Sequence, residues 1–289
     1  MKNIILIKYC FSFFIMVSFS LGIGLKGLII PENGYVLSTV GTGIAEGISP
    51  SLNPALNVLP SSYVEFSLNQ WIGDIKGSHT AYYFGGKFSQ SITLQTWNAK
   101  ELQLWGDTPN STSLGTFSVH YVSAAYSISH DLNTPFRFGF RLQTNYSHLF
   151  TESMSGMTIS GGVLFPLNSY YTVGFVVKNL GQEKIDNMRS KLPVEIGLGA
   201  KLKLPFNILL LTDVIYLSEM DKDIRLGLRT NWTWINLHMG SSFHESRNSK
   251  AMGFSFNYRK WLISYGVYYH ENTMLAPSLP QFLDIRRYL

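Results

Sequence analysis

The stretch FRFGFRLQTNY, residues 136–146, alternates between two kinds of side chain. Its even positions hold aromatic, leucine and threonine residues, whereas its odd positions hold two arginines, a glycine and two amides. Side chains alternate across a β-strand, so the pattern predicts a strand with one face in an apolar medium and the other in water. Its length exceeds the usual five or six residues of a soluble strand and matches the ~9–11 that cross a bilayer at a tilt. We therefore predict a membrane-spanning strand, with a long strand of a soluble sandwich as the alternative.

The same two-sided pattern returns along most of the chain. Residues 192–204 alternate aliphatic side chains with glycine, lysine and glutamate, and residues 223–230 alternate isoleucine and leucine with arginine and glycine. A soluble protein would have to hide such long apolar stripes in its interior, whereas a membrane barrel turns them toward lipid. We therefore predict an all-β protein, a transmembrane antiparallel β-barrel of about fourteen strands. The other strands are expected at residues 62–70, 78–85, 88–97, 101–105, 116–130, 157–165, 170–178, 207–217, 232–240, 251–258, 261–270 and 282–288.

Two further features are expected at the ends of the barrel. Residues 183–189 form the most charged connection after the N-terminal region and are expected as a solvated loop that caps one end. The tryptophans fall near expected strand ends, where a membrane barrel carries a girdle of aromatic residues. They are Trp71, Trp97, Trp105, Trp232, Trp234 and Trp261.

The composition agrees with a barrel and excludes several classes of protein. Charged residues make up only 14% of the chain, against about 25% in soluble domains, and aromatic residues another 14%. No uninterrupted apolar run of helical membrane length follows residue 30, which excludes helical spans. A closed barrel reconciles these facts, because only half of each strand has to be apolar. The net charge of +5 is spread along the chain, so no patch suggests a nucleic-acid partner.

The first residues indicate export. Lys2 and Lys8 precede and flank an apolar stretch over residues 9–21, and Ser18-Phe19-Ser20 offers small residues for a signal peptidase. We predict a cleaved signal peptide over residues 1–20, with a retained anchor helix as the alternative. The single cysteine, Cys10, lies in this segment, so the mature chain would contain no thiol or disulfide. Export and a barrel together predict a multi-pass protein of the bacterial outer membrane.

Residues 21–61 form an N-terminal segment that precedes the barrel, expected over residues 62–289. The segment is rich in glycine, serine, asparagine and proline. Gly41, Gly43 and Gly47 are spaced one residue too far apart for a dinucleotide-binding loop, and turns explain them better. The seven histidines form no H-x-x-x-H pattern, and no G-x-S-x-G or G-x-x-x-x-G-K motif occurs. We therefore expect no enzyme, no metal site and no cofactor.

Several short motifs follow one another in a familiar order. They are Asn53-Pro54-Ala55, Gln70-Trp71-Ile72-Gly73-Asp74-Ile75, Val176-Val177-Lys178-Asn179-Leu180-Gly181, Leu192-Pro193-Val194-Glu195-Ile196-Gly197-Leu198-Gly199 and Leu279-Pro280-Gln281-Phe282-Leu283-Asp284-Ile285-Arg286. Through them the chain resembles the PorV/PorQ-type outer-membrane proteins, a FadL-like group of barrels found in bacteria with type IX secretion. It departs from the group at Leu52, where a tryptophan is usual, and at the non-aromatic terminal Leu289.

The resemblance implies a FadL-like barrel with the N-terminal segment near or inside the lumen as a plug. It also implies a non-enzymatic accessory of protein secretion that shuttles cargo or attaches it to the surface. The implied partners are outer-membrane lipid, cargo proteins with C-terminal signal domains, a surface sortase or attachment complex, and the barrel-assembly machinery. The alternative is a FadL-like, porin-like passive channel for hydrophobic or small molecules. In that case Asn53, Pro54 and Ala55 would belong to a gate.

The odd parity of the strands supplies the residues expected to face the lumen. These polar positions would suit water and anions, or they would neutralise one another and hold the barrel together. The candidates are Arg137, Arg141, Gln143, Glu195, Lys201, Lys203, Arg225 and Arg229.

Overall fold

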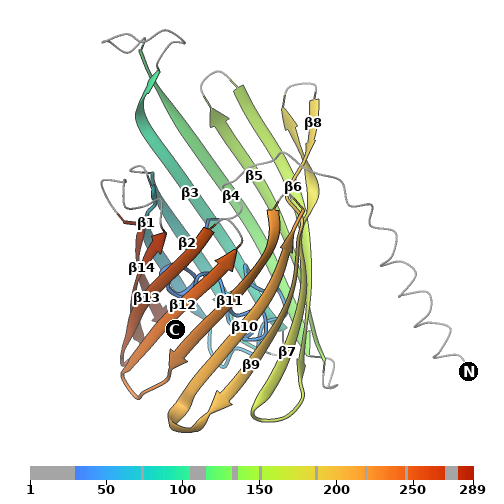
Figure 1. The fold of residues 1–289 in the computed structure, drawn as a ribbon, viewed down its shortest axis with the longest axis vertical. Coiled ribbons are helices and arrows are strands. Elements are labelled where there is room, and N and C mark those ends of the chain that lie inside the picture. The colour runs from blue at the N-terminus through green and yellow to red at the C-terminus, as the bar shows by residue number, and fades with distance from the viewer. Residues whose placement is uncertain are drawn as a thin grey trace, which may run out of the picture.

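Antiparallel strands wrap around a common axis in the computed structural model, which describes residues 30–72, 75–86, 88–104, 115–131, 136–149, 152–185, 188–218, 220–244, 247–270 and 279–289 (Figure 1). Consecutive strands pair along the wall, and β1 pairs with β15. The short strand β8 pairs only with β7 and stands above β9, so the two share one of fourteen positions in the wall. The predicted antiparallel barrel of about fourteen strands is confirmed. The strands are β1 (Tyr63–Gln70), β2 (Lys76–Phe84), β3 (Phe88–Leu104), β4 (Gly115–Asp131), β5 (Arg137–Leu149), β6 (Glu152–Pro166), β7 (Tyr171–Ile185), β8 (Met188–Lys191), β9 (Glu195–Leu204), β10 (Ile208–Leu217), β11 (Met220–Thr230), β12 (Ile235–His244), β13 (Arg247–Tyr258), β14 (Trp261–His270) and β15 (Gln281–Tyr288).

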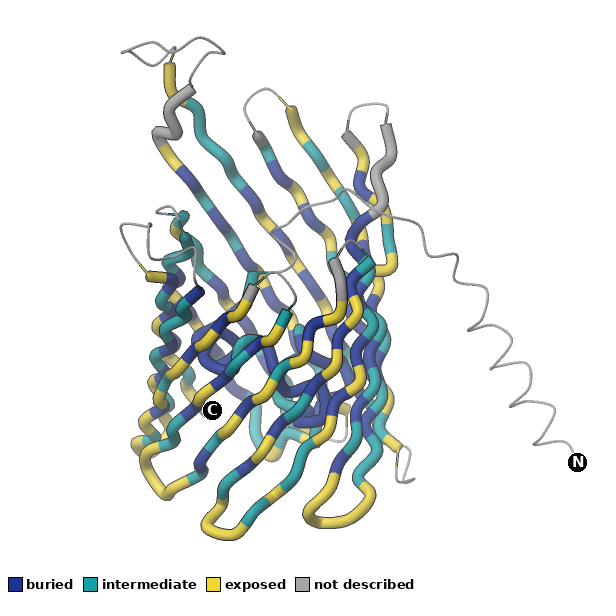
Figure 2. Tube along the Cα trace, viewed as in Figure 1, coloured by how far each residue is buried: buried dark blue, intermediate teal, exposed yellow. Residues whose placement is uncertain are grey.

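The apolar parity of each strand faces outward. In β5, Phe140 is 61% exposed while its neighbour Arg141 is only 4% exposed. The same alternation of exposed and buried residues runs along the other strands (Figure 2). Exposed phenylalanine and leucine on the outside of a barrel, with arginine inside, is the arrangement of a protein surrounded by lipid. The soluble sandwich is thereby excluded.

Strands β3, β6, β7 and β13 extend farther than the sequence indicated, and β8 was not expected. The two segments expected at residues 88–97 and 101–105 form one strand, β3, whose pairing with β4 shifts register between Ala99 and Leu102. The charged loop predicted at residues 183–189 is wrong, because β7 continues to Ile185 and β8 turns back beside it. Alternating hydropathy marks a strand only where its two faces meet surroundings of different polarity. Strand segments beyond the apolar belt therefore lack that signal.

The tryptophan girdle is only partly correct. Trp97 is buried inside the barrel, where its ring centroid lies 5.8 Å from that of Phe282, and Trp71 packs in the same cluster. Trp232, Trp234 and Trp261 are exposed beside the turns at the end of the barrel opposite the β3–β4 connection. Trp105 and the predicted signal peptide lie outside the described residues. We call the end with Trp232, Trp234 and Trp261 the lower end of the barrel, and the end that carries the β3–β4 connection the upper end (Figure 1).

Residues 30–60, the inner segment, lie within the barrel (Figure 1). The segment contains one short helix, α2 (Gly34–Ser38), which Asn33 caps through a bond from the Val36 amide to its side chain. All of residues 32–56 are buried except Val40, Ile48 and Ser51, which are partly buried. No helix among the described residues is long and apolar enough to cross a membrane.

Glycines on the inward parity let the inner segment approach the wall. A Cβ atom on Gly139 would lie 2.1 Å from the Pro54 carbonyl oxygen, and one on Gly240 would lie 2.4 Å from the carbonyl carbon of Thr39. Only glycine leaves room for main chain at such positions. The inner segment is also close to inward glycines elsewhere around the barrel, at Gly162, Gly174, Gly199, Gly253 and Gly266.

Alanine at Gly139 should therefore unseat the inner segment. We expect Gly139→Ala to lower the free energy of unfolding by about 1–3 kcal/mol, since its methyl group would overlap the Pro54 carbonyl. Gly161→Ala is the matched control, because Gly161 points outward and the added methyl group would lie 3.9 Å from its nearest neighbour, Phe140. Urea unfolding in lipid vesicles measures both. Equal effects of the two substitutions would contradict the close approach.

Candidate functional site

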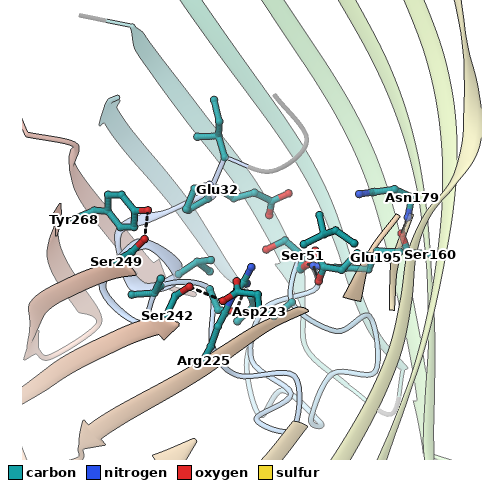
Figure 3. A pocket seen from close by; sticks show the side chains of 18 of the residues that line it. Glu32, Ser51, Ser160, Asn179, Glu195, Asp223, Arg225, Ser242, Ser249 and Tyr268 are labelled. Atoms are coloured by element: carbon teal, nitrogen blue, oxygen red, sulfur yellow. Dashed lines mark hydrogen bonds and ion pairs between the residues drawn. The ribbon is translucent and has the colours of Figure 1, made fainter. Parts of the chain in front are cut away.

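A cavity of about 270 Å³ lies above the inner segment, in the upper part of the barrel (Figure 3). Its walls come from many strands of the barrel, including Gln95 of β3, Arg141 of β5 and Ser249 of β13. Tyr268 and His270 of β14 line it near its upper rim. The barrel therefore encloses a chamber whose floor is the inner segment.

The floor of this upper cavity is mainly apolar. Ile30, Val36, Val40 and Leu52 of the inner segment line it. The wall adds Leu217 and the indole of Trp71, which stacks on Tyr268 with 5.6 Å between ring centroids. A solute with an apolar part can therefore bury that part against the floor.

The walls of the cavity are polar, and their cations are paired with carboxylates. Lys178 lies 2.5 Å from Glu195, and Arg225 lies 2.7 Å from Asp223. The Arg141 guanidinium donates to the carboxylate of Glu32 in the inner segment. The three pairs leave little uncompensated charge facing the cavity.

The remaining predicted lumen residues share the inward parity but lie outside the cavity lining, apart from Gln143. Arg229 lies 2.7 Å from Glu46, and Arg137 lies 3.4 Å from Asp131. Neither Lys201 nor Lys203 forms an ion pair within the part of the chain that the structure describes. Gln143 donates to the side chain of Asn145 at 2.9 Å.

Carboxylates on the wall bind the main chain of the inner segment. Asp284 of β15 accepts bonds from the amides of Gly34, at 2.8 Å, and Tyr35, at 3.3 Å. Asp213 of β10 accepts from Gly43 at 2.6 Å and from Ile44 at 3.1 Å. Sequence reasoning missed both aspartates. The available signal was a single carboxylate on the inward parity of each of the two strands.

A second contact links the short helix to β11. The Tyr35 hydroxyl donates to Glu46, which also pairs with Arg229. Burial raises the pKa of the Tyr35 phenol well above its ordinary value, so the group remains a hydrogen-bond donor at neutral pH. On another strand, Glu65 accepts from Asn33 at 2.8 Å and from Arg286 at 2.8 Å. These interactions tie the start of the helix to the barrel.

The predicted gate residues form a fixed turn against the wall. Asn53 is fully buried, and its Nδ2 donates to the carbonyls of Ile44 at 2.8 Å and Val163 at 3.3 Å. The Ala55 amide donates to Asn53 Oδ1 at 3.0 Å. Pro54 packs against the inward glycines, and none of the three residues lines the upper cavity.

The wall is irregular where β7 meets β8 and β9. The β7–β9 ladder reaches Lys178 and Glu195, and pairing resumes with β8 at Gln182 and Lys191. Asn179 has a φ of 62°, in the left-handed region, and β7 bulges there against β6. Residues 179–181 and 192–194 therefore face one another without ladder pairing. Ser160, Lys178, Asn179 and Glu195, which surround this gap, line the cavity, and Leu192 is fully buried beside it.

No group of three histidine, cysteine, aspartate or glutamate side chains in the described ranges could hold a metal ion. His79 is buried 3.7 Å from Glu32 and 3.9 Å from Glu65. Among the described residues, no serine, threonine or cysteine side chain forms a hydrogen bond with the His79 ring. The arrangement is that of a binding chamber with internally paired charges.

The sequence matches no family model and no curated protein. Solved structures, in contrast, share the architecture. The toluene transporter TbuX of Ralstonia pickettii aligns with a TM-score of 0.63 and 10% identity, over 89% of this chain and 98% of that one. The toluene transporter TodX of Pseudomonas putida gives 0.62 and 11%, over 89% and 97%. A FadL homologue of Pseudomonas aeruginosa gives 0.62 and 8%, over 89% and 98%.

The fold is a FadL-like barrel. At these identities the likeness concerns the fold alone. It confirms the FadL-like architecture that the resemblance implied. It gives no support to the narrower PorV/PorQ group.

Val40 combines backbone strain with a place in the cavity floor. Its φ of 55° is unfavourable for a β-branched residue, at a cost of about 1–3 kcal/mol. Relief of this strain should offset the lost side chain, so we expect Val40→Gly to change the free energy of unfolding by less than about 1 kcal/mol. Val36→Gly, in the helix, should cost about 2–5 kcal/mol. Urea unfolding compares the two, and a large loss at Val40 would refute the strain.

The Glu46–Arg229 pair should be important for stability. Glu46 is 2% exposed, so Glu46→Gln would leave a buried guanidinium without its carboxylate, at a cost of about 3–5 kcal/mol. Asp131→Asn is the control, because the Asp131–Arg137 pair is a quarter to a third exposed and should contribute less than about 1 kcal/mol. Unfolding midpoints in urea test the difference. Similar losses in the two variants would show that the inner pair is not effectively buried.

Proposed function

We propose that the protein is a passive channel of the bacterial outer membrane for small, uncharged molecules with an apolar part. The observation that carries this proposal is the upper cavity, which has an apolar floor and charge-paired walls. Solved structures of toluene transporters with the same fold support it by analogy. This is the alternative that the sequence left open.

The electrostatics of the cavity favour an uncharged solute. An ion entering the chamber would lose hydration, and the charged side chains there already have partners in Glu32, Glu195 and Asp223. A neutral solute loses less hydration and gains contact with Val36, Val40 and the other apolar floor residues. The polar lumen predicted to suit anions is therefore better explained as internal pairing.

The contacts of the inner segment favour a route through the wall over one along the axis. Asp213 and Asp284 each hold two main-chain amides of the segment, and Glu46 adds a buried ion pair. An axial path would break these interactions together. The unpaired stretch between β7 and β9 lies beside the cavity, and only side chains such as Leu192 need to move there.

The connections support an orientation with the cavity on the outer side. None of the lower connections exceeds five residues, whereas β3–β4 and β14–β15 are joined at the upper end by ten residues each. Outer-membrane barrels have short periplasmic turns and longer extracellular loops. The cavity would then receive solute from outside the cell.

A bulky residue in the cavity should block uptake. We expect cells with an intact lipopolysaccharide layer to take up radiolabelled toluene faster when they produce the protein, and benzoate no faster. Gln143→Trp, which fills the cavity, should lower the gain severalfold. Thr144→Trp is the control, since the next residue of β5 faces lipid. The proposal fails if toluene uptake does not depend on the protein or if both variants behave alike.

The secretion role implied by the PorV/PorQ resemblance stays a prediction. Its cargo proteins and its attachment complex would bind the connections at the upper end. The cavity concerns the inside of the barrel and the comparisons concern its fold, and neither gives support for that role.

A further inference from the structure

Three cations gather on the outer surface at the lower end. Arg259 and Lys260 form the turn between β13 and β14, and Arg287 lies on the neighbouring β15. The register places Trp261 opposite Arg287, and the Tyr288 amide donates to the Lys260 carbonyl at 2.8 Å. All three cationic side chains are exposed. They form one cationic cluster that spans adjacent strands.

This cluster differs from the arginines inside the barrel. Arg141, Arg225 and Arg229 each have a carboxylate partner. Within the described residues, none of the cluster's cations pairs with a carboxylate. Positive charge without a partner attracts an anion from outside the protein.

Aromatic residues lie beside the cations. The Arg259 guanidinium is 5.3 Å from the ring of Tyr258, and that of Arg287 is 5.3 Å from the ring of Trp261. Both rings are exposed. Exposed tyrosine and tryptophan at strand ends mark the level of lipid headgroups in a membrane barrel. The cations therefore lie where a headgroup would.

Apolar residues continue from this level toward the middle of the barrel. Phe256, Ile263 and Ile285 lie side by side on β13, β14 and β15, paired through Ile263, and all three are exposed. The next outward row contains Phe254 and Leu283. From the end of the barrel inward, the surface thus passes from a level of cations and aromatic rings to apolar rows.

We propose that this surface binds an anionic phospholipid. The phosphate of the headgroup would lie on Arg259, Lys260 and Arg287, the glycerol region beside Trp261, and an acyl chain along the apolar rows. This sequence of chemistries matches one lipid molecule in order. The site lies on the outside of the wall and is independent of transport through the cavity.

Native mass spectrometry of the purified barrel in detergent tests the site with dioleoyl phosphatidylglycerol as the probe and dioleoyl phosphatidylcholine as the zwitterionic comparison. We expect tighter binding of phosphatidylglycerol. Each lost cation should weaken it about fivefold, because a basic residue at a membrane surface contributes roughly 1 kcal/mol. The test variant is R259Q/K260Q/R287Q, and single substitutions serve if it does not fold.

The control removes equal charge from the outward face near the upper end. Lys76, Lys184 and Lys250 are exposed there on three separate strands, and K76Q/K184Q/K250Q should bind the probe like the unmodified protein. Equal losses in the two triple variants would overturn the site, as would binding of both lipids with equal affinity. Displacement by an equal concentration of inorganic phosphate would show that the acyl chain contributes nothing, which also overturns the proposal.

Discussion

The structure depends on one requirement, that main-chain N–H and C=O groups have partners inside a lipid layer that offers none. A sheet meets this requirement only by closing on itself, and here β1 pairs with β15 to complete the ring. Closure gives every strand a lipid face and an inner face. Everything else about the interior follows from the polar residues that this alternation turns inward.

Those inward groups need partners, and the inner segment supplies many of them. Asp213 and Asp284 would be costly to bury alone inside a barrel, but each accepts hydrogen bonds from two main-chain amides of the segment. The segment gains equally, since its own amides would otherwise lack acceptors at the start of α2 and at Gly43. Inward glycines such as Gly139 bring the two main chains close enough for this exchange. Wall and segment are therefore one folded unit.

The sequence predicted the wall well because lipid leaves a signal in every strand it touches. Phe136 to Tyr146 already indicated which side chains face outward. The ends of β3 and β7 and the whole of β8 were not predicted, because they lie beyond the apolar belt and neither of their faces meets lipid. The interior was predictable only as a parity. Arg141 could be placed inside, but its partner Glu32 lies 109 positions away and only the fold brings them together. The prediction that placed Trp97 in the outer girdle was wrong for a related reason, since proximity to a strand end does not say which face of the strand a residue occupies.

The gap between β7 and β9 departs from the requirement that shapes the rest of the wall. Unpaired main chain at membrane depth is tolerated where it is buried in protein or lines a water-filled space. Here the gap adjoins the upper cavity through Lys178 and Asn179, and Leu192 is buried beside it. The left-handed Asn179 amide donates to the Ser160 hydroxyl at 3.2 Å, which replaces one lost ladder bond. Because residues 179–181 and 192–194 form no ladder pairs with one another, side chains and not strand pairing close the wall between them. A gap in the strand pairing of a membrane barrel is tolerated beside an internal cavity, and the gap between β7 and β9 lies beside the upper cavity.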